Sequence, residues 1–114
     1  MKSIGIVETK YGKVSGVTSD RKEYEGITYF KGIPYAAPPL GELRWRPPAD
    51  PDCWEGVRAC DTYPAMARQD MGTGASFEPW ATDFYYMGHP KNDEYCLYLN
   101  VTTGAASAGE KRPV

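Results

Sequence analysis

The sequence predicts at most one domain, built from a few β-strands joined by unusually long irregular segments and containing little helix. A chain of 114 residues can bury a core but has little left for peripheral elements. Its 12 glycines and 10 prolines are too many for a helical bundle and too few for a low-complexity chain. Nine tyrosines, three tryptophans and three phenylalanines carry apolar surface that needs cover, which argues against disorder.

Charge and hydropathy exclude two classes of partner. The formal net charge is −2 and the 13 lysines and arginines form no run, so no nucleic-acid binding is expected. No apolar stretch approaches the roughly 18 residues that cross a bilayer, so no membrane insertion is expected. The N-terminal apolar run is too short for the core of a signal peptide. We therefore expect a cytoplasmic protein, or one that has already been processed.

Two short strands are predicted at the N-terminus. Residues Ile4–Thr9 and Lys13–Val17 are strand-like runs on either side of a turn at Tyr11-Gly12. Glycine can adopt the positive φ that a tight hairpin needs, so the two runs should form an antiparallel hairpin. Residues 19–26 are polar and should connect this hairpin to the next strand.

A third strand and a proline-rich segment follow. Residues Ile27–Ala36 are β-branched and aromatic, and Pro34 should end this strand or place it at a sheet edge. The closely spaced prolines from Pro38 to Pro51 predict an irregular, extended segment. A plain linker would not carry large apolar residues, so we expect those in this segment to anchor it against a core. They are Leu40, Leu43, Trp45 and Trp54.

The second half of the chain predicts one further strand between loops. Residues 56–72 have moderate helical content at best, and residues 72–94 read as a long aromatic loop with one helical turn. The strongest strand prediction is Tyr95–Thr103, followed by an exposed loop at residues 103–112, where nicking or a boundary is expected. Loops this long indicate that the surface they pack against lies outside the chain.

Both faces of the last predicted strand carry residues worth burying. This pattern favours an inner strand of a sheet that is covered on both sides. One face carries Leu97, Leu99 and Val101, and the other carries Cys96, Tyr98 and Asn100.

The three cysteines predict neither a disulfide framework nor a metal site. Cys53, Cys60 and Cys96 are an odd number, whereas short secreted proteins normally pair all their cysteines. The spacing of Cys53 and Cys60 fits no common zinc motif, and only His89 could join them. We expect three reduced thiols in a reducing compartment, and Cys96 as a buried one.

Two motifs carry a resemblance to a known family. The segments "FKGIPYAAPPLGELRWRPP" (Phe30–Pro48), with Trp54 and Gly56 after it, and "EYCLYLNV" (Glu94–Val101) resemble the N-terminal part of type-B carboxylesterases. That family includes para-nitrobenzyl esterases, cholinesterases and the non-catalytic neuroligins. The resemblance implies an α/β-hydrolase fold with a mostly parallel sheet. Residues 1–114 would be the N-terminal part of one domain, supplying antiparallel edge strands, a proline-rich loop and an aromatic loop.

The family's catalytic groups are missing from this chain. The resemblance implies acyl transfer by a serine in a G-x-S-x-G turn, assisted by Glu or Asp and a histidine. Neither that turn nor the Gly-Gly oxyanion loop occurs here, and His89 lies far from the position of the family's histidine. We expect no catalytic residue, no cofactor and no metal in this chain. Its partner would be the rest of the esterase, as a second chain or an uncut continuation, and its substrate a small ester.

The resemblance also implies a structural ion pair and a missing disulfide. Arg44 and Glu94 match positions where the family pairs arginine with glutamate, which would tie the proline-rich segment to the last strand. In secreted relatives the cysteine of this strand forms a disulfide with a cysteine just before a glutamine, where this chain has Arg68. Cys96 therefore lacks the family's partner. Tyr95 stands where the family usually has aspartate.

The aromatic loop is the one segment here that would touch substrate. In relatives the equivalent loop borders the gorge that leads to the serine, and apolar aromatic walls suit ester pockets. Packing of the same side chains onto their own sheet is the competing interpretation. The candidates are Trp80, Phe84, Tyr85 and Tyr86.

Three functions compete on this evidence. The first is the N-terminal part of a serine carboxylesterase whose triad lies in the remainder. The second is a non-catalytic binding or adhesion protein of the same fold, against which the missing cysteine framework and signal peptide count. The third is a free-standing, aromatic-rich β module that binds carbohydrate, which would leave its last strand as an exposed edge.

Overall fold

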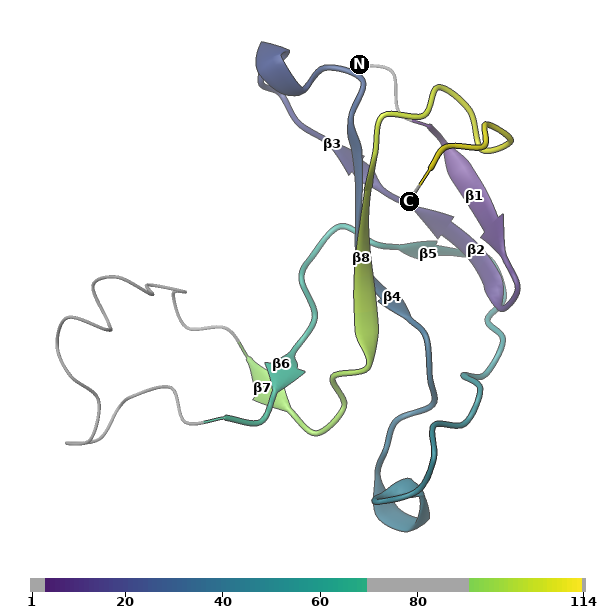
Figure 1. Ribbon diagram of the computed structural model, residues 1–114, viewed down its shortest axis with the longest axis vertical. Helices are drawn as coiled ribbons and strands as arrows, with labels where there is room; N and C mark the ends of the chain where they lie inside the picture. The colour runs from purple at the N-terminus through teal and green to yellow at the C-terminus, as the bar shows by residue number, and fades with distance from the viewer. Residues whose placement is uncertain (1–3, 70–90, 114) are drawn as a thin grey trace, which may run out of the picture.

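The computed structural model describes residues 4–69 and 91–113, which form eight short strands and two 3-10 helices (Figure 1). The strands pair into three small sheets, two of three strands and one of two. The 3-10 helices are η1 (Lys22–Tyr24) and η2 (Gly41–Leu43). The strands are β1 (Ile6–Thr9), β2 (Gly12–Ser15), β3 (Val17–Thr18), β4 (Thr28–Pro34), β5 (Val57–Ala59), β6 (Met66–Ala67), β7 (Asn92–Asp93) and β8 (Tyr98–Thr103).

The predicted N-terminal hairpin is confirmed, with its turn one residue earlier than expected. β1 and β2 pair antiparallel and Thr9 lies opposite Gly12, so Lys10 and Tyr11 form the turn. The hydroxyl of Thr9 stabilises it by donating to the carbonyl of Gly12 at 2.7 Å. The same oxygen accepts the N–H of Tyr11 at 3.2 Å. Neither Lys10 nor Tyr11 has a positive φ, so the centre of this turn needs no glycine.

Gly12 is instead required by a close approach of Trp54. A Cβ added at Gly12 would lie 2.5 Å from Nε1 of the indole, far inside contact distance. That indole N–H donates to the carbonyl of Lys13 at 2.8 Å, and the backbone N–H of Trp54 donates to Tyr11 at 3.0 Å. The guanidinium of Arg58 covers the ring at 5.5 Å from its centre. The end of the proline-rich segment is thereby fixed to the hairpin.

Moderate helical content was expected over residues 56–72, but the described part of that range, residues 56–69, contains β5 and β6 and no helix, so the prediction was wrong there. β5 pairs parallel with β2, and β6 pairs parallel with β7. The N–H of Cys60 donates to Ser15 at 2.8 Å, and the carbonyl of Cys60 accepts the N–H of Lys31 at 2.9 Å. These backbone partners lie far away in the sequence, which is why a strand of three residues left no local pattern.

The strand predicted at Ile27–Ala36 is confirmed as β4, which ends at Pro34 as expected. It lies between β3 and β8 in an antiparallel sheet, with a β-bulge between Phe30 and Ile33. Gly32 has a φ of 77° within the bulge, and its N–H donates to Oδ1 of Asn100 at 2.9 Å. The side chain of Asn100 therefore replaces the ladder partner that the bulge removes.

The bulge sets which residues share a face of this sheet. Phe30 lies opposite Val101, and Ile33 lies opposite Leu99. Opposite residues on paired strands point to the same side, so these four apolar residues form one face. The core forms where this face meets the hairpin. It consists of Val14, Phe30 and Cys60, with Ile4, Val7, Ile33 and Trp54 packed against it.

The proline-rich segment is irregular as predicted, apart from η2, but most of its expected anchors are exposed. It projects from the sheets as a loop (Figure 1) whose base is closed by a 2.9 Å hydrogen bond from Ala37 to Ala49. Trp45 is 96% exposed, and Leu40 and Leu43 are exposed as well. Of the four predicted anchors only Trp54 packs on the core, because the loop carries the other three away from the sheets.

β8 differs from its prediction in length and position. It begins at Tyr98 rather than Tyr95, because the N–H of Tyr98 donates back to Cys96 at 2.9 Å and forms a tight turn. Within the described residues β8 is an edge strand, paired on one side with β4, so the predicted inner position is not found there. Leu99 and Val101 are 40% and 39% exposed.

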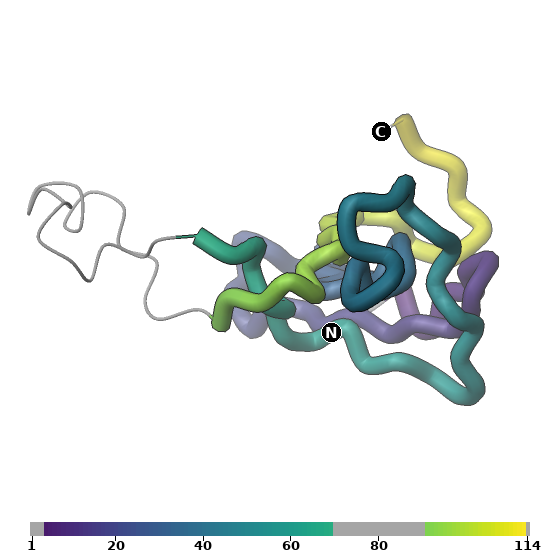
Figure 2. The backbone as a smooth tube through the Cα atoms, turned by 90° about the horizontal axis from the view of Figure 1, so that it is seen from below, coloured from purple at the N-terminus to yellow at the C-terminus, as the bar shows by residue number. Residues whose placement is uncertain are grey.

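The chain after β8 folds back toward the hairpin. Residues 104–113 form no strand or helix, and they are exposed except for Ala105. Figure 2 shows this loop, in yellow, at one end of the molecule, away from the chain around β6 and β7 at the other.

Candidate functional site

Two features of the described residues bear on function: an ion pair beside β7, and an apolar cavity between the hairpin and β8. The ion pair lies next to the base of residues 70–90. That base is formed by the parallel pair β6 and β7 and by a 2.9 Å hydrogen bond from Met66 to Lys91. The four predicted substrate contacts and His89 lie outside the described residues. The predicted contacts are Trp80, Phe84, Tyr85 and Tyr86.

The structure brings Arg44 and Glu94 together, although 50 positions separate them in the sequence. Nη2 of Arg44 donates to Oε2 of Glu94 at 2.6 Å. Arg44 is held in place by η2, since its N–H donates to Gly41 at 3.2 Å. The two side chains are 48% and 42% exposed, and pairs this open contribute at most about 1 kcal/mol. The pair therefore positions the tip of the proline-rich loop more than it stabilises the fold.

The residues around Glu94 form a small polar cluster. The backbone N–H of Tyr95 donates to Asp93 at 3.2 Å, and this bond holds the pKa of Asp93 below its usual value. Nζ of Lys91 lies 3.5 Å from Asp93 on its other side. These contacts fix the backbone conformation between β7 and β8, and thereby hold Glu94 within reach of Arg44.

Tyr95, where the resembled family usually has aspartate, packs its ring against Tyr98. The ring centres lie 4.8 Å apart with a tilt of 37°. Burial raises the pKa of Tyr98 to about 12, and a hydrogen bond with Tyr95 adds to the effect. The ring at position 95 therefore covers the start of β8, which an aspartate could not do.

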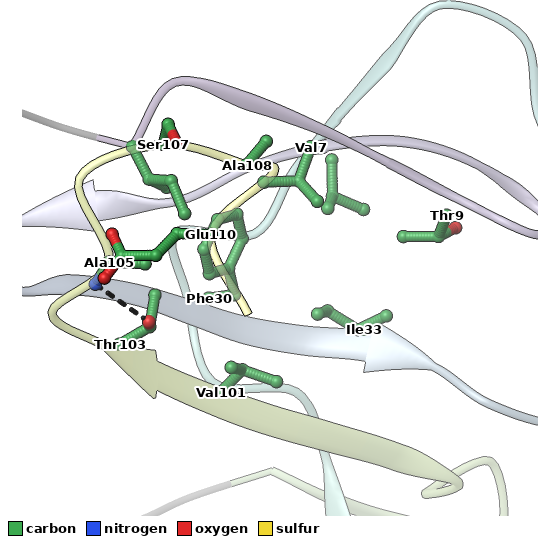
Figure 3. Close-up of a pocket in the computed structure, with 12 residues that line it drawn as sticks. Val7, Thr9, Phe30, Ile33, Val101, Thr103, Ala105, Ser107, Ala108 and Glu110 are labelled. Atoms are coloured by element: carbon green, nitrogen blue, oxygen red, sulfur yellow. Dashed lines mark hydrogen bonds between the residues drawn. The ribbon is translucent and has the colours of Figure 1, made fainter. Parts of the chain in front are cut away.

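An apolar cavity of about 290 Å³ lies between the hairpin and the β4–β8 sheet (Figure 3). Phe30, Ile33 and Val101 form its floor, as seen in the close-up, and Val7 faces them from β1. The loop after β8 supplies the remaining wall. The complete lining is Ile4, Val7, Thr9, Val14, Phe30, Ile33, Val101, Thr103, Ala105, Ser107, Ala108 and Glu110.

Glu110 holds the loop wall of the cavity together. Its carboxylate accepts the N–H of Ala106 at 2.8 Å and Nε of Arg112 at 2.7 Å. The hydrogen bond from Ala106, reinforced by Arg112, lowers the pKa of Glu110. Ala105 is tied back to the strand by its N–H, which donates to the hydroxyl of Thr103 at 3.1 Å. Sequence reasoning missed this wall because small polar residues give no sign of lining an apolar space.

The serines of the described residues have no histidine beside them. Ser15 lies in β2, and Ser107 lines the cavity, but residues 4–69 and 91–113 contain no histidine to act as a base. Across the same two ranges no cluster of three His, Cys, Asp or Glu could hold a metal ion. Nor is any described helix long and apolar enough to cross a membrane.

The three cysteines are all free thiols in different surroundings. Cys60 is buried in the core, where burial raises the pKa of its thiol. Cys53 is exposed, and Cys96 is half-buried at the turn before β8 rather than fully buried as expected. A protonated, buried thiol at Cys60 is a packing residue rather than a nucleophile.

Comparison with known proteins identifies a family. Residues 3–114 match the carboxylesterase family. The chain is 38% identical over 101 residues to carboxylesterase 1F of Mus musculus, covering 88% of this chain and 18% of that protein. It is 36% identical over 96 residues to para-nitrobenzyl esterase of Bacillus subtilis, covering 84% of this chain and 17% of that protein.

Solved esterase structures match as well. A structure titled PNB esterase has a TM-score of 0.70 and 35% identity, covering 88% of this chain and 18% of its own. The carboxylesterase of Geobacillus stearothermophilus has a TM-score of 0.68 and 35% identity, covering 95% of this chain and 18% of its own. These neighbours have the α/β-hydrolase fold, of which this chain shows a small strand-rich part. The chain spans about a fifth of the length of the relatives it matches.

Proposed function

Because this chain belongs to the carboxylesterase family, we propose that it is the N-terminal part of a serine carboxylesterase that hydrolyses carboxylic esters. The observation that carries the proposal is the match of residues 3–114 to esterases of which the chain covers about a fifth. The nucleophilic serine, the Glu or Asp, the histidine and the oxyanion donors would belong to the remaining part. The chain itself supplies scaffold.

The chemistry of such an enzyme sets what the scaffold must do. A serine activated by histidine attacks the ester carbonyl, the alcohol leaves, and water then hydrolyses the acyl-enzyme. Backbone N–H groups that stabilise the oxyanion work only when they are held in place beforehand. In this proposal the β3–β4–β8 sheet forms one antiparallel end of a larger, mostly parallel sheet. The Arg44–Glu94 pair positions the proline-rich loop beside the base of residues 70–90.

The aromatic residues between β6 and β7 are proposed as contacts for the ester. Support comes from their residue types and from their place in the chain next to the Arg44–Glu94 pair. Replacing Trp80 or Phe84 with alanine should raise KM for aromatic esters more than it lowers kcat, since uniform binding is lost. If the alanine variants instead lose thermal stability and keep the parent's KM, these side chains pack against the protein and do not contact the ester.

A cytoplasmic location is proposed on the basis of the cysteines. Three free thiols, one of them in the core, suit a reducing compartment. The test is to purify the protein from its source, denature it without reductant and titrate its thiols. Cys53, Cys60 and Cys96 should all react. Fewer than three would indicate an oxidised cysteine and an oxidising compartment.

A hybrid esterase tests the proposed function. It consists of para-nitrobenzyl esterase of Bacillus subtilis in which the matched N-terminal segment is replaced by this chain. The expected result is a cooperatively folded protein that hydrolyses para-nitrophenyl esters. A hybrid that folds but hydrolyses no ester would overturn the proposal and favour a non-catalytic role. Carboxylesterase 1F and para-nitrobenzyl esterase are both named for ester hydrolysis, which gives the non-catalytic role no support.

A further inference from the structure

Noncovalent contacts among the described residues hold the two ends of residues 70–90 together. β6 and β7 pair parallel there, and the N–H of Met66 donates to the carbonyl of Lys91 at 2.9 Å. No disulfide reinforces this base, because residues 61–95 contain no cysteine and the thiol of Cys96 is free. A sheet of two very short strands is weak by itself. The base therefore needs a further connection to the rest of the fold.

Tyr95 connects β7 to the β3–β4–β8 sheet. Its backbone N–H donates at 3.2 Å to Oδ1 of Asp93, the last residue of β7. Its ring packs against Tyr98, the first residue of β8, with ring centres 4.8 Å apart. Tyr98 lies opposite Pro34 of β4, the central strand of that sheet. Tyr95 therefore links the second end of residues 70–90 to the sheet, along the short segment that runs from β7 to β8 (Figure 1).

The ring pair differs in kind from the ion pairs of the same segment. The Arg44–Glu94 pair is about half-exposed and the side chain of Lys91 is 79% exposed, so water and salt screen both interactions. The rings of Tyr95 and Tyr98 are half-buried, and contact between aromatic rings does not depend on net charge. Burial and the hydrogen bond with Tyr95 raise the pKa of Tyr98 to about 12, so this phenol stays neutral at physiological pH. The ring pair is therefore a connection that salt does not weaken.

We propose that Tyr95 is a positioning residue for ester binding, because its contact with Tyr98 fixes the second end of residues 70–90 to the β3–β4–β8 sheet. The inference rests on the proposed function, in which the aromatic residues between β6 and β7 contact the ester. Tyr95 does not touch the ester and acts through the backbone of β7. A displaced end would weaken the contacts that the segment makes with the ester before and during the reaction, and this loss of uniform binding raises KM.

The first measurement is the kinetics of three variants of the hybrid esterase. Tyr95→Ser removes the ring pair and Tyr95→Phe keeps it. Tyr24→Ser is the matched control, because it makes the same change at a tyrosine of η1, which lies outside the base. Tyr95→Ser should raise KM for para-nitrophenyl esters about threefold or more, while kcat changes by less than about twofold. Tyr95→Phe and Tyr24→Ser should keep the parent's KM.

The second measurement is tryptic cleavage, which needs no esterase activity. The carbonyl of the Lys91–Asn92 bond accepts the N–H of Met66, so trypsin reaches this bond only when the base opens. Tyr95→Ser should be cut there about 2- to 10-fold faster than the parent, as expected for the loss of one aromatic pair. Tyr95→Phe and Tyr24→Ser should be cut at the parent's rate.

Three outcomes would overturn the proposal. One is cleavage of Tyr95→Ser no faster than that of Tyr24→Ser, and another is an unchanged KM for Tyr95→Ser. The third is an equal rise in KM for Tyr95→Phe, which would mean that the phenol contacts the ester. If Tyr95→Ser yields no folded protein, Tyr95→Leu keeps apolar volume without the ring and should show both effects. A folded parent that hydrolyses no ester would refute the proposed function, whereas an active parent whose KM is insensitive to Tyr95→Ser would refute the role of Tyr95 alone.

Discussion

The two three-stranded sheets differ in how completely their apolar faces are covered by the rest of the described chain. In the β1–β2–β5 sheet the chain provides its own cover: Trp54 closes over Gly12, and Val14 and Cys60 are buried. In the β3–β4–β8 sheet the apolar face extends past its cover, and Leu99 and Val101 remain exposed. Contacts within the chain therefore close the first region, whereas the described residues leave part of the second region's apolar face exposed.

Removing the side chain shared by both regions should have the largest effect. Phe30 lies on β4 and is buried against the hairpin, and Phe→Ala changes in cores cost about 3–5 kcal/mol. Denaturant unfolding of the hybrid esterase should show this loss for Phe30→Ala. Tyr63→Ala, at an exposed aromatic, should cost under about 1 kcal/mol. Equal losses would mean that Phe30 is not the centre of the core.

The hairpin sheet should fail next when its close packing is disturbed. Gly12→Ala places a Cβ against the Trp54 indole and should cost about 1–3 kcal/mol through overpacking. Gly26→Ala is the control, because Gly26 has a φ of 81° but open space around it. Its cost should be about 1 kcal/mol, from backbone conformation alone. If Gly12→Ala costs no more than the control, the Gly12–Trp54 contact does not constrain the hairpin.

The Arg44–Glu94 pair should contribute less. A double-mutant cycle with Arg44→Gln and Glu94→Gln should give a coupling energy of about 0.2–1 kcal/mol, since both side chains are half-exposed. The coupling should fall further in 1 M salt. The same cycle on Lys10 and Asp50, a more exposed pair at 3.3 Å, should give a smaller value. A larger coupling energy for Lys10 and Asp50 would contradict the claim that the Arg44–Glu94 pair has a particular role in positioning the proline-rich loop.

The smallest expected effect is a change in acid sensitivity at Glu110. Its folded-state pKa is lowered, so its contribution is present above the unfolded-state value, near 4.5, and is lost as pH falls through the folded value. Glu110→Gln should therefore flatten the dependence of unfolding midpoint on pH below 4.5. Glu55→Gln, which removes one exposed carboxylate elsewhere, is the control. An unchanged pH profile for Glu110→Gln would mean that the loop wall does not depend on this carboxylate.

Local sequence was sufficient to predict the parts held by local chemistry. The hairpin follows from alternating apolar residues around a turn, and β4 ends at Pro34 because proline donates no hydrogen bond. The meeting of Arg44 and Glu94 was expected from the family resemblance, since no local pattern joins residues 50 positions apart. The Gly12–Trp54 contact was missed for the same reason.

Prediction failed where an outcome depends on a distant partner. β5 is a strand because β2 offers it a parallel edge, which residues 56–72 do not reveal. Trp45 was expected to anchor a loop and is exposed, because apolar character does not say which surface will cover it. β8 begins three residues late because of the turn at Cys96. Each miss lies where a contact is decided by neighbours in space.

The central claim is that this chain supports a serine esterase without supplying its nucleophile. The most direct measurement is fluorophosphonate labelling of the native protein, purified from the cells that produce it, with the labelled peptide mapped by mass spectrometry. The expected result is one labelled serine, on a polypeptide or continuation outside residues 1–114. Label on Ser15 or Ser76, or a preparation that hydrolyses esters without any labelled serine, would contradict the claim.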